Sequence, residues 1–555
     1  MVHRYRIDDK NSIFTTPEMT TRVQSADVDS IFHDLGPYGP YQVCQYLYSL
    51  LMMIPVTYPV LIYVFIGYPP NFQCQNFTKP SSNHSIITNT TIITEPQSCD
   101  VTFRSTSLLN ESESTAAPCP YGYMYEGPQT VVTEWDLVCD RETLGQMSTA
   151  MVMVGQILGA VAFSVMVDRY GRHEVTCVCF IAMTACSIGL SITTHFVLFV
   201  ILRLMIGAFQ QGIQMAQGSL VIEMFPTEFR ATCTLIGALM WSFSVATLSL
   251  FAWLLQNHSW RYLQLLAGLL GIHCLGTHWI QHESLRWLVA NGKMDEIKVW
   301  IHRAARWNKK DPEKILSRFY LPESEQLIVG SEQTPDCSHV PGEEKYNILD
   351  IVRRKRIFLI SLVIWSAWFT VSLSYYGLYL MSSSLSGNIY LNFFLIALAE
   401  SPSQFIAWYL FRRIGRRYTT ISFLTVSGLS LIASALSLKY AANADTLSLI
   451  FSLFGMFSVA GAFSCLVLFT PELYPTNLRS TGLGLASTAA RIGSVLSPFA
   501  SSLAIYVPWG PGVTFGALCL SITFLFLCLP ETKDIELPTT VEDLDKSSKN
   551  LSSVT

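Results

Sequence analysis

The sequence predicts an all-α polytopic membrane protein with twelve transmembrane helices in two pseudo-symmetric halves of six. Three observations support this prediction. The 555 residues are 50% hydrophobic and only 14% charged, whereas a soluble protein has about 25% charged residues. The charges are unevenly spread, so many windows of about 20 residues, the length that crosses a bilayer, hold almost none. Two motifs of the first half also recur in the second.

The apolar windows divide the chain into alternating spans and polar segments. The first span is expected to be broken at Pro55 and Pro59, because proline disrupts a helix interior. Spans 11 and 12 are expected at roughly 480–504 and 510–529. The predicted segments are a cytoplasmic N-terminal arm at 1–42, helix 1 at 43–67, an extracellular loop at 68–142, helices 2–6 at 143–281, a cytoplasmic linker at 282–356, helices 7–12 at 357–529 and a cytoplasmic tail at 530–555.

The loop 68–142 combines acceptor sites for N-linked glycans with cysteines. Glycosylation sequons begin at Asn76, Asn83, Asn89 and Asn110. The cysteines are Cys74, Cys99, Cys119 and Cys139. Glycans and disulfides form in oxidising compartments, so we expect this loop to be extracellular. Four cysteines predict two disulfide bonds, and the sequence leaves all three connectivities open.

The distribution of Lys and Arg predicts the same orientation. The linker 282–356 holds 14 of them and the turn 412–417 holds four, whereas the loop 68–142 holds three. Cytoplasmic loops carry the excess of positive charge in membrane proteins. We therefore expect both termini, the linker and this turn to lie in the cytoplasm. Residues 1–40 are polar, so no cleavable signal peptide is recognised.

Two short motifs occur twice at nearly equal offsets. DRYGR at 168–172 is matched by RRIGR at 412–416, 244 residues later, and EMFPTEFR at 223–230 by ELYPTNLR at 472–479, 249 residues later. Glycine allows a tight turn, and the arginines can hold acidic groups across a seam that opens and closes. The residues expected to gate the cytoplasmic side are Asp168, Arg169, Gly171, Arg172, Glu223, Arg230, Arg413, Gly415, Arg416, Glu472 and Arg479.

Two parallel halves of this kind resemble the major facilitator transporters, which rock around a site near the middle of the bilayer. Three further segments make the resemblance more specific: EWDLVC at 134–139, ESLRWL at 283–288 and LPET at 529–532. Together with the stretch 472–499, they resemble the organic cation, anion and carnitine transporter family over about residues 35–540. The stretch 472–499 and the tail 537–544 are most similar to organic anion transporters.

Two basic residues lie well inside predicted spans, Arg203 and Arg491. A cation at bilayer depth costs about 3 kcal/mol, so it normally faces a bundle interior or a water pathway. Arg491 lies 12 residues past the turn that ends at Arg479, about 18 Å along a helix and near the bilayer midplane. It either contacts an anionic substrate or forms a buried ion pair with Glu400, and the two roles are compatible. We expect Arg203 to be structural.

Aromatic residues cluster in the seventh span and either pack the helix or line a ligand site. The resemblance favours the second role, because Trp368, Tyr375, Tyr376 and Phe463 match positions that line the cavity of organic anion transporters. It also implies that Arg491 favours anions or carnitine, since cation transporters typically have an aspartate there. Gln404 stands where anion transporters often have a lysine, which implies a less positive cavity suited to monoanions or zwitterions.

The expected function is polyspecific transport of small organic anions across the plasma membrane by alternating access, with exchange as a mode that the resemblance implies. The expected substrate-binding residues are Arg491, Glu400, Trp368, Tyr375, Tyr376, Phe463 and Gln404. The alternatives are a carnitine-like zwitterion or organic cation transporter of the same fold, and a receptor or sensor that does not transport.

The expected partners are small organic ions and the lipid bilayer. Nothing in the sequence indicates an enzyme, a metal site or a cofactor. No GxxxxGK[ST] nucleotide-binding motif is present, so we expect no nucleotide. The net charge of −4 argues against a nucleic-acid partner.

Overall fold

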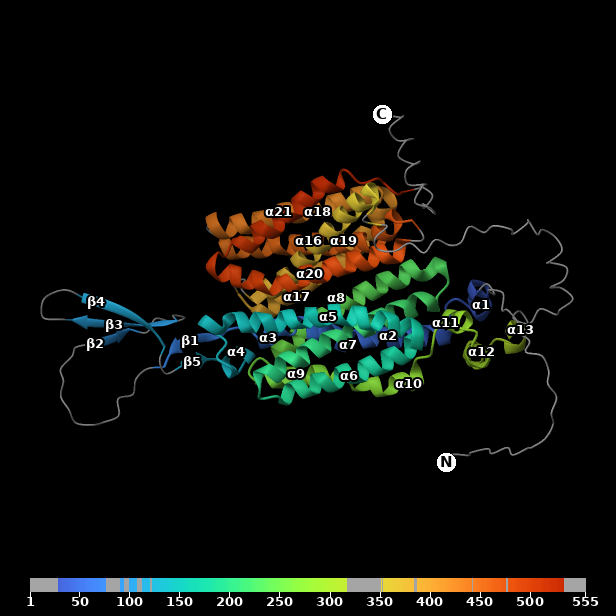
Figure 1. Cartoon of the computed structure of the whole chain (residues 1–555), viewed down its shortest axis with the longest axis horizontal. Helices are drawn as coiled ribbons and strands as arrows, with labels where there is room; N and C mark the ends of the chain where they lie inside the picture. Colours follow the sequence, from blue (N-terminus) through green and yellow to red (C-terminus); the bar gives the residue numbers. More distant parts are fainter. Residues whose placement is uncertain are drawn as a thin grey trace, which may run out of the picture. The chain divides into compact units, whose positions relative to one another are not determined.

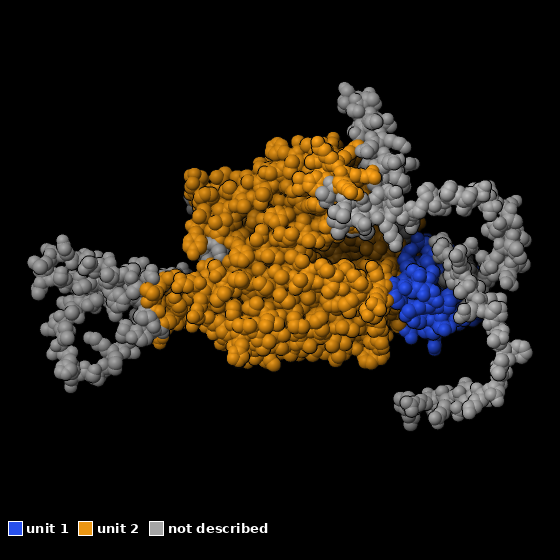
Figure 2. Space-filling model, viewed as in Figure 1, with its two compact units in different colours: residues 1–41, 285–334 blue, residues 42–284, 335–555 orange. Residues whose placement is uncertain are grey.

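The computed structural model describes residues 28–75, 90–93, 99–106, 112–119, 122–316, 351, 353–383, 387–441, 443–475 and 478–533. The predicted sequons at Asn76, Asn83, Asn89 and Asn110 lie outside these residues, as do most of the N-terminal arm, much of the linker and the tail from residue 534. The chain forms two compact units, coloured separately in Figure 2. One comprises residues 1–41 and 285–334, and the other comprises residues 42–284 and 335–555.

The larger unit is a bundle of long helices (Figure 1). Within the described ranges, ten helices are long and apolar enough to cross a membrane, which supports the prediction of a multi-pass membrane protein. They are α2 (Pro40–Leu61), α5 (Glu142–Tyr170), α6 (Arg172–Ile192), α7 (Phe196–Met224), α8 (Arg230–Leu254), the segment Trp260–Ile280 that contains α9 (Trp260–Leu270) and α10 (Thr277–Ile280), α16 (Lys355–Leu380), α17 (Ile389–Arg413), α18 (Arg416–Tyr440) and α19 (Ala444–Leu473).

Two more helices occupy the region of predicted spans 11 and 12. α20 (Arg479–Tyr506) has 28 residues, but Arg491 and several serines and threonines lower the hydropathy of its central part. α21 (Gly510–Phe526) is strongly apolar but has only 17 residues. Neither therefore belongs to the ten helices that meet both criteria.

The predicted break in the first span is wrong. α2 continues through Pro55 and Pro59 and ends at Leu61, where the short helix α3 (Tyr63–Ile66) follows. A proline lacks the N–H group that a helix interior would use. Membrane helices tolerate this loss because neighbouring helices and side chains can satisfy the freed carbonyl groups.

The polar loop between α3 and α5 contains strands, which the all-α prediction did not include. β1 (Asn71–Cys74) pairs antiparallel with β5 (Tyr123–Glu126). β2 (Thr90–Ile93), β3 (Asp100–Thr106) and β4 (Ser112–Pro118) form an antiparallel sheet in that order. The two predicted disulfides are present as Cys74–Cys119 and Cys99–Cys139, which selects one of the three connectivities. The helix α4 (Val131–Glu134) leads from this loop toward α5.

The smaller unit packs four helices around its own apolar core: α1 (Val28–Leu35), α11 (Leu285–Ala290), α12 (Met294–Asn308) and α13 (Pro312–Leu316). Trp300 lies edge-on to Phe32 and Tyr41. The Asn308 side chain accepts a hydrogen bond from the backbone N–H of Tyr41 and donates one to the carbonyl of Leu35. The linker therefore begins with a folded segment that packs on the N-terminal arm.

The first and second halves of the larger unit meet along two helix pairs, α5 with α20 and α8 with α17. In the first half, α5 and α7 approach so closely that their backbones nearly touch. A Cβ atom at Gly155 would lie 2.0 Å from the Leu204 carbonyl oxygen, and one at Gly207 would lie 2.0 Å from the Val152 carbonyl oxygen. Gly159, one turn from Gly155, makes a similar approach. This is the small-residue packing that membrane helices use to associate.

We predict that Gly155→Ala destabilises the protein, because the added methyl group would overlap the α7 backbone at a cost of about 1–3 kcal/mol. The matched control is Gly218→Ala on α7, where a Cβ atom meets nothing within 4 Å. Thermal unfolding of the purified protein in detergent measures both. The apparent Tm should fall for Gly155→Ala and stay the same or rise for Gly218→Ala, and equal values would contradict the packing argument.

Candidate functional site

Arg491 projects from α20 toward the first half of the bundle and is held by neutral side chains. Its Nη1 atom donates to Gln156 Oε1 on α5 at 2.6 Å, and its Nη2 atom donates to Gln214 Oε1 on α7 at 3.3 Å. Tyr376 on α16 interacts with the same guanidinium. Among the described residues, no carboxylate forms an ion pair with Arg491. The positive charge is therefore positioned without being neutralised.

The glutamine that accepts from Arg491 is itself fixed by a hydrogen-bond chain. Gln156 Nε2 donates to Gln210 Oε1 at 2.9 Å, and Gln210 Nε2 donates to the carbonyl of Val56 at 2.7 Å. Gln156 and Gln210 are buried. Each amide uses its nitrogen as a donor and its oxygen as an acceptor, so both oxygens point toward the Arg491 end of the chain. The packing of α2, α5 and α7 thus sets the position of the guanidinium.

Of the two roles considered for Arg491, the ion pair with Glu400 is not present among the described residues. Glu400 is buried on α17, and its Oε2 atom accepts hydrogen bonds from the hydroxyls of Tyr375 at 3.0 Å and Tyr379 at 2.9 Å. Trp241 Nε1, on α8 of the first half, donates to the Tyr375 hydroxyl at 2.9 Å. Hydroxyl donors satisfy the carboxylate, whereas amide oxygens satisfy the guanidinium, so each charge has neutral partners of its own.

Four of the other predicted site residues, Trp368, Tyr375, Tyr376 and Phe463, form an aromatic surface. Phe463 on α19 contacts Trp368 at a ring-centroid distance of 5.4 Å and Tyr375 at 5.9 Å. Tyr375 and Tyr376 lie edge-to-face at 5.2 Å. Trp368 is anchored by a hydrogen bond from its Nε1 atom to Thr470 Oγ1 at 2.8 Å. The Gln404 side chain accepts a hydrogen bond from Ser464 Oγ at 2.5 Å, and among the described residues it forms none with this surface.

This arrangement can recognise a small ion with an aromatic or apolar body. A carboxylate can take two parallel hydrogen bonds from a guanidinium, the strongest pairing that arginine makes. Apolar and aromatic walls with a few placed polar groups are typical of small-molecule sites. Glu400, which accepts hydrogen bonds from two tyrosine hydroxyls, offers a second, negative group. The site therefore supports binding of an organic anion at Arg491, and it also contains a group that could face a cation.

Sequence reasoning missed the contribution of the first half: Gln156, Gln210, Gln214 and Trp241. A signal was available, because α7 carries four glutamines within eight residues, at 210, 211, 214 and 217. Polar side chains inside a membrane span are rare and commonly functional. The prediction concentrated on charged residues and so passed over these amides.

Arg203, predicted to be structural, is 2% exposed on α7 and packs between aromatic rings. Its Nε atom donates to the carbonyl of Ser148 at 3.2 Å, and its guanidinium carbon lies 5.1 Å from the Tyr63 ring centroid and 6.0 Å from that of Phe199. Cation–π contacts of this kind stabilise a desolvated arginine. These contacts join α5 and α7 to α3. They do not involve Arg491 or its hydrogen-bond partners.

The repeated turns have matching ion pairs in the two halves. Arg172 Nη2 lies 3.2 Å from Glu223 and 3.7 Å from Asp168. Arg416 Nε lies 3.2 Å from Glu472. Gly171 and Gly415 precede these arginines with φ values of 103° and 94°, which an L side chain rarely adopts. Among the remaining predicted gate residues, Arg169 and Arg413 lie over the rings of Tyr170 and Tyr409.

Arg230 and Arg479 follow the second motif in each half. Arg230 begins α8 and Arg479 begins α20. Two buried guanidinium nitrogens of Arg479, Nε and Nη2, have no hydrogen-bond partner among the described residues. The structure therefore does not bring Arg479 into the ion pair between Arg416 and Glu472.

Two further acids cap the N-terminal ends of α6 and α18. Sequence reasoning did not include them among the gate residues. Glu283 accepts from the backbone N–H of His173 at 3.1 Å, and Glu531 accepts from those of Arg416 and Arg417 at 2.8 and 3.1 Å. Burial raises the pKa of Glu283, and its backbone donors oppose that effect. A carboxylate at a helix N-terminus is stabilised by the helix dipole. The motifs at 283–288 and 529–532 thus act as equivalent caps.

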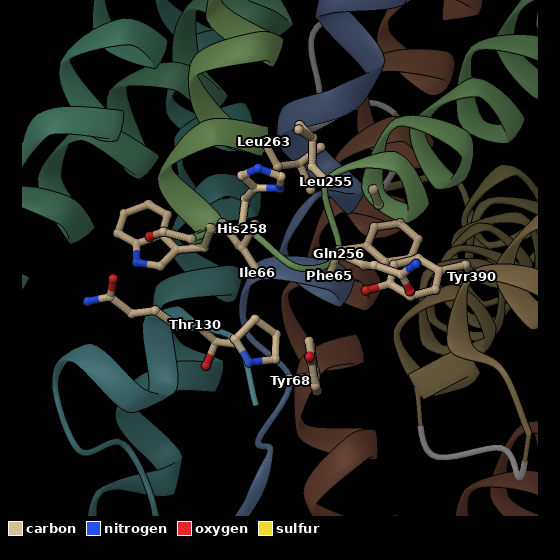
Figure 3. Close-up of a pocket in the computed structure, with 14 residues that line it drawn as sticks. Phe65, Ile66, Tyr68, Thr130, Leu255, Gln256, His258, Leu263 and Tyr390 are labelled. Carbon is tan, nitrogen blue, oxygen red and sulfur yellow. The ribbon is translucent and has the colours of Figure 1, made fainter. Parts of the chain in front are cut away.

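A cavity of about 20 Å³ lies elsewhere, near the loop between α8 and α9 (Figure 3). Phe65, Thr130, Gln256 and Tyr390 are among its lining residues. The cavity has room for about one water molecule, whereas ligand sites typically enclose about 300–1,000 Å³. None of the predicted substrate-binding residues lines it, so it is not a candidate for the substrate site.

Comparison with solved structures agrees with the helical architecture. The xylose transporter XylE from E. coli, in a partially occluded inward-open conformation, superposes with a TM-score of 0.60 at 14% sequence identity. The match covers 90% of this chain and 100% of the XylE chain. At this identity the likeness demonstrates a shared fold and nothing about the substrate.

Sequence comparison gives the family. The model described as Major Facilitator Superfamily matches residues 136–498. Solute carrier family 22 member 21 of Mus musculus is 30% identical over 546 residues, covering 94% of each chain. Organic cation/carnitine transporter 2 of Rattus norvegicus is 29% identical over 541 residues, covering 93% of this chain and 94% of the relative. These are membrane transporters and not enzymes. The chain therefore belongs to the major facilitator superfamily and, within it, to solute carrier family 22, the organic cation, anion and carnitine transporters.

Proposed function

We propose that the protein is a plasma-membrane transporter of small organic anions that works by alternating access around Arg491. The observation that carries this proposal is the set of neutral partners around the guanidinium, Gln156 and Gln214. Amide oxygens position the charge but leave it uncompensated, so a substrate carboxylate can supply the missing counter-charge. The aromatic residues Trp368, Tyr375, Tyr376 and Phe463 would contact the apolar body of the same substrate.

Alternating access requires that the site be shared between the two halves. Arg491 bonds to α5 and α7, and Tyr375 receives a hydrogen bond from Trp241 on α8. A substrate that competes for these contacts would alter how strongly the halves associate, which is how ligand binding can bias a conformational equilibrium. We further propose that α20 and α21 are spans 11 and 12. We also propose that the ends of the helix bundle that carry the lysine- and arginine-rich segments face the cytoplasm.

One observation favours a second candidate, transport of a carnitine-like zwitterion. Glu400 is buried without a cationic partner among the described residues and lies within a group of tyrosines. A quaternary ammonium group binds well to aromatic rings beside a carboxylate. A zwitterion could therefore place its carboxylate at Arg491 and its ammonium near Glu400. The rat relative named above carries cation and carnitine in its name, which is consistent with this alternative.

Replacing Arg491 with alanine should lower uptake of an aromatic monocarboxylate roughly 10- to 100-fold. This is the effect of losing hydrogen bonds to a charged group that are worth about 1.5–3 kcal/mol. Uptake by Arg491→Lys should lie between that of the wild type and that of Arg491→Ala, because lysine keeps the charge but not the planar fork of the guanidinium. Radiolabelled uptake into expressing cells, normalised to surface protein, measures the effect. Thr488→Ala, an exposed change on α20, is the control, and wild-type uptake by Arg491→Ala would contradict the proposal.

Glu400→Gln separates the two candidate substrates. For an organic anion transporter we expect carboxylate uptake to change less than about threefold, because the glutamine still accepts from Tyr375 and Tyr379. For a zwitterion transporter, uptake of labelled carnitine should fall at least about tenfold through loss of the negative charge. Parallel uptake of both compounds by wild type and variant decides between them. Carnitine uptake that the variant retains in full would reject the zwitterion candidate.

The proposed gate residues give a further prediction. Arg416→Ala removes the partly buried contact with Glu472 and should change the uptake rate about fivefold, as expected for a contact of about 1 kcal/mol. Arg412→Ala is the matched control, because this neighbouring arginine lies over the Trp408 ring instead. Initial uptake rates at saturating substrate should differ between the variants. Equal rates for Arg416→Ala and Arg412→Ala would remove the ion pair from the gating mechanism.

A further inference from the structure

Three potential metal ligands converge where α6 packs against α10, outside the proposed substrate site. His173 and Cys177 lie one turn apart on α6, so their side chains share a helix face. His278 reaches the same place from α10. One donor atom from each of the three residues lies within 4.8 Å of the other two. None of these residues contributes to the hydrogen-bond network around Arg491 or Glu400.

The separations suit a small divalent cation. His173 Nε2 and Cys177 Sγ are 3.5 Å apart. In tetrahedral zinc coordination, bonds of about 2.0–2.1 Å to nitrogen and about 2.3 Å to sulfur place the two ligand atoms about 3.6 Å apart. His278 is exposed, whereas His173 and Cys177 are buried. Rotation of the exposed His278 imidazole can bring its nitrogen to the same distance from the other two donor atoms. The exposed side of the cluster leaves room for a water molecule as the fourth ligand.

The surroundings of His173 resemble the outer shell of a metal site. Its Nδ1 atom lies 3.6 Å from Glu174 Oε1, while its Nε2 atom points toward Cys177. A metal-binding histidine typically offers its second ring nitrogen to a carboxylate or carbonyl, which fixes the ring and the tautomer. Ordinary helix packing requires neither this orientation nor the convergence of three nitrogen and sulfur donors.

We propose that His173, Cys177 and His278 form a zinc-binding site. Two imidazoles and one thiolate with a fourth, water-occupied position are a ligand set suited to Zn²⁺. Binding would form one Zn–S bond and two Zn–N bonds and would release the thiol proton of Cys177 to solvent. The bound metal would tie α10 to the first turn of α6, where Glu283 accepts from the backbone N–H of His173.

The test is direct zinc binding to the full-length protein in detergent after removal of metals with a chelator. Competition with a chromogenic zinc chelator measures affinity and stoichiometry, and Co²⁺ substitution reports thiolate coordination through its charge-transfer absorption. We expect one tight site in the wild type. Cys177→Ser and His278→Ala should each weaken it at least about 100-fold, more than outer-shell changes, which cost about 10- to 100-fold. Glu174→Gln should weaken it about tenfold.

The controls replace the same residue types away from the cluster. Cys186→Ser changes a different cysteine on α6, and His258→Ala changes an exposed histidine. Both should bind zinc like the wild type. His278 is exposed, so His278→Ala keeps the test decisive even if Cys177→Ser fails to fold. Equal zinc affinity and stoichiometry for wild type, Cys177→Ser and His278→Ala, or no tight binding to the wild type, would overturn the proposal.

Discussion

The central constraint in this structure is a permanent positive charge on α20 whose hydrogen-bond partners are neutral. A cation at bilayer depth, where we propose that Arg491 lies, costs about 3 kcal/mol. Hydrogen bonds from a charged donor are worth about 1.5–3 kcal/mol each, so Gln156 and Gln214 offset that cost without cancelling the charge. The two amides lie on the opposite half of the bundle. The same contacts therefore position the charge without neutralising it and join the halves.

The outer framework follows from the duplication of the chain. In each half, a glycine with positive φ ends one helix and starts the next, an arginine pairs with a glutamate from the second motif, and a further glutamate caps the new helix. The caps are Glu283 and Glu531. Two equivalent clusters of modest strength are consistent with the proposed gating role, because no single contact is strong enough to fix one arrangement. We propose that the asymmetry that selects the substrate lies instead between these two clusters, where the second half contributes Arg491 and Glu400.

Much of the fold was predictable from the sequence, and part of the site was. Long apolar windows locate membrane helices because lipid leaves the backbone few alternatives, and the repeated turns indicate the two halves. The partners of Glu400, which are Tyr375 and Tyr379 and not Arg491, could not be chosen from the sequence, because sequence gives the depth of a residue along its helix but not the direction in which its side chain points. Gln156 and Gln214 were missed because the prediction considered the charged residues inside the spans and not the uncharged amides. The helix through Pro55 and Pro59 and the strands of the loop depend on neighbours that are distant in the chain.

The most direct test of the account is Gln156→Glu, which replaces the neutral acceptor of Arg491 by a carboxylate of almost the same shape. Equilibrium binding of an aromatic carboxylate and of its uncharged amide analogue should be measured on purified wild type and variant. The account predicts that carboxylate affinity falls at least about tenfold, a change of about 1.4 kcal/mol, while any affinity for the amide is unchanged. Carboxylate binding as tight in the variant as in the wild type would contradict the claim that the uncompensated charge of Arg491 selects the substrate.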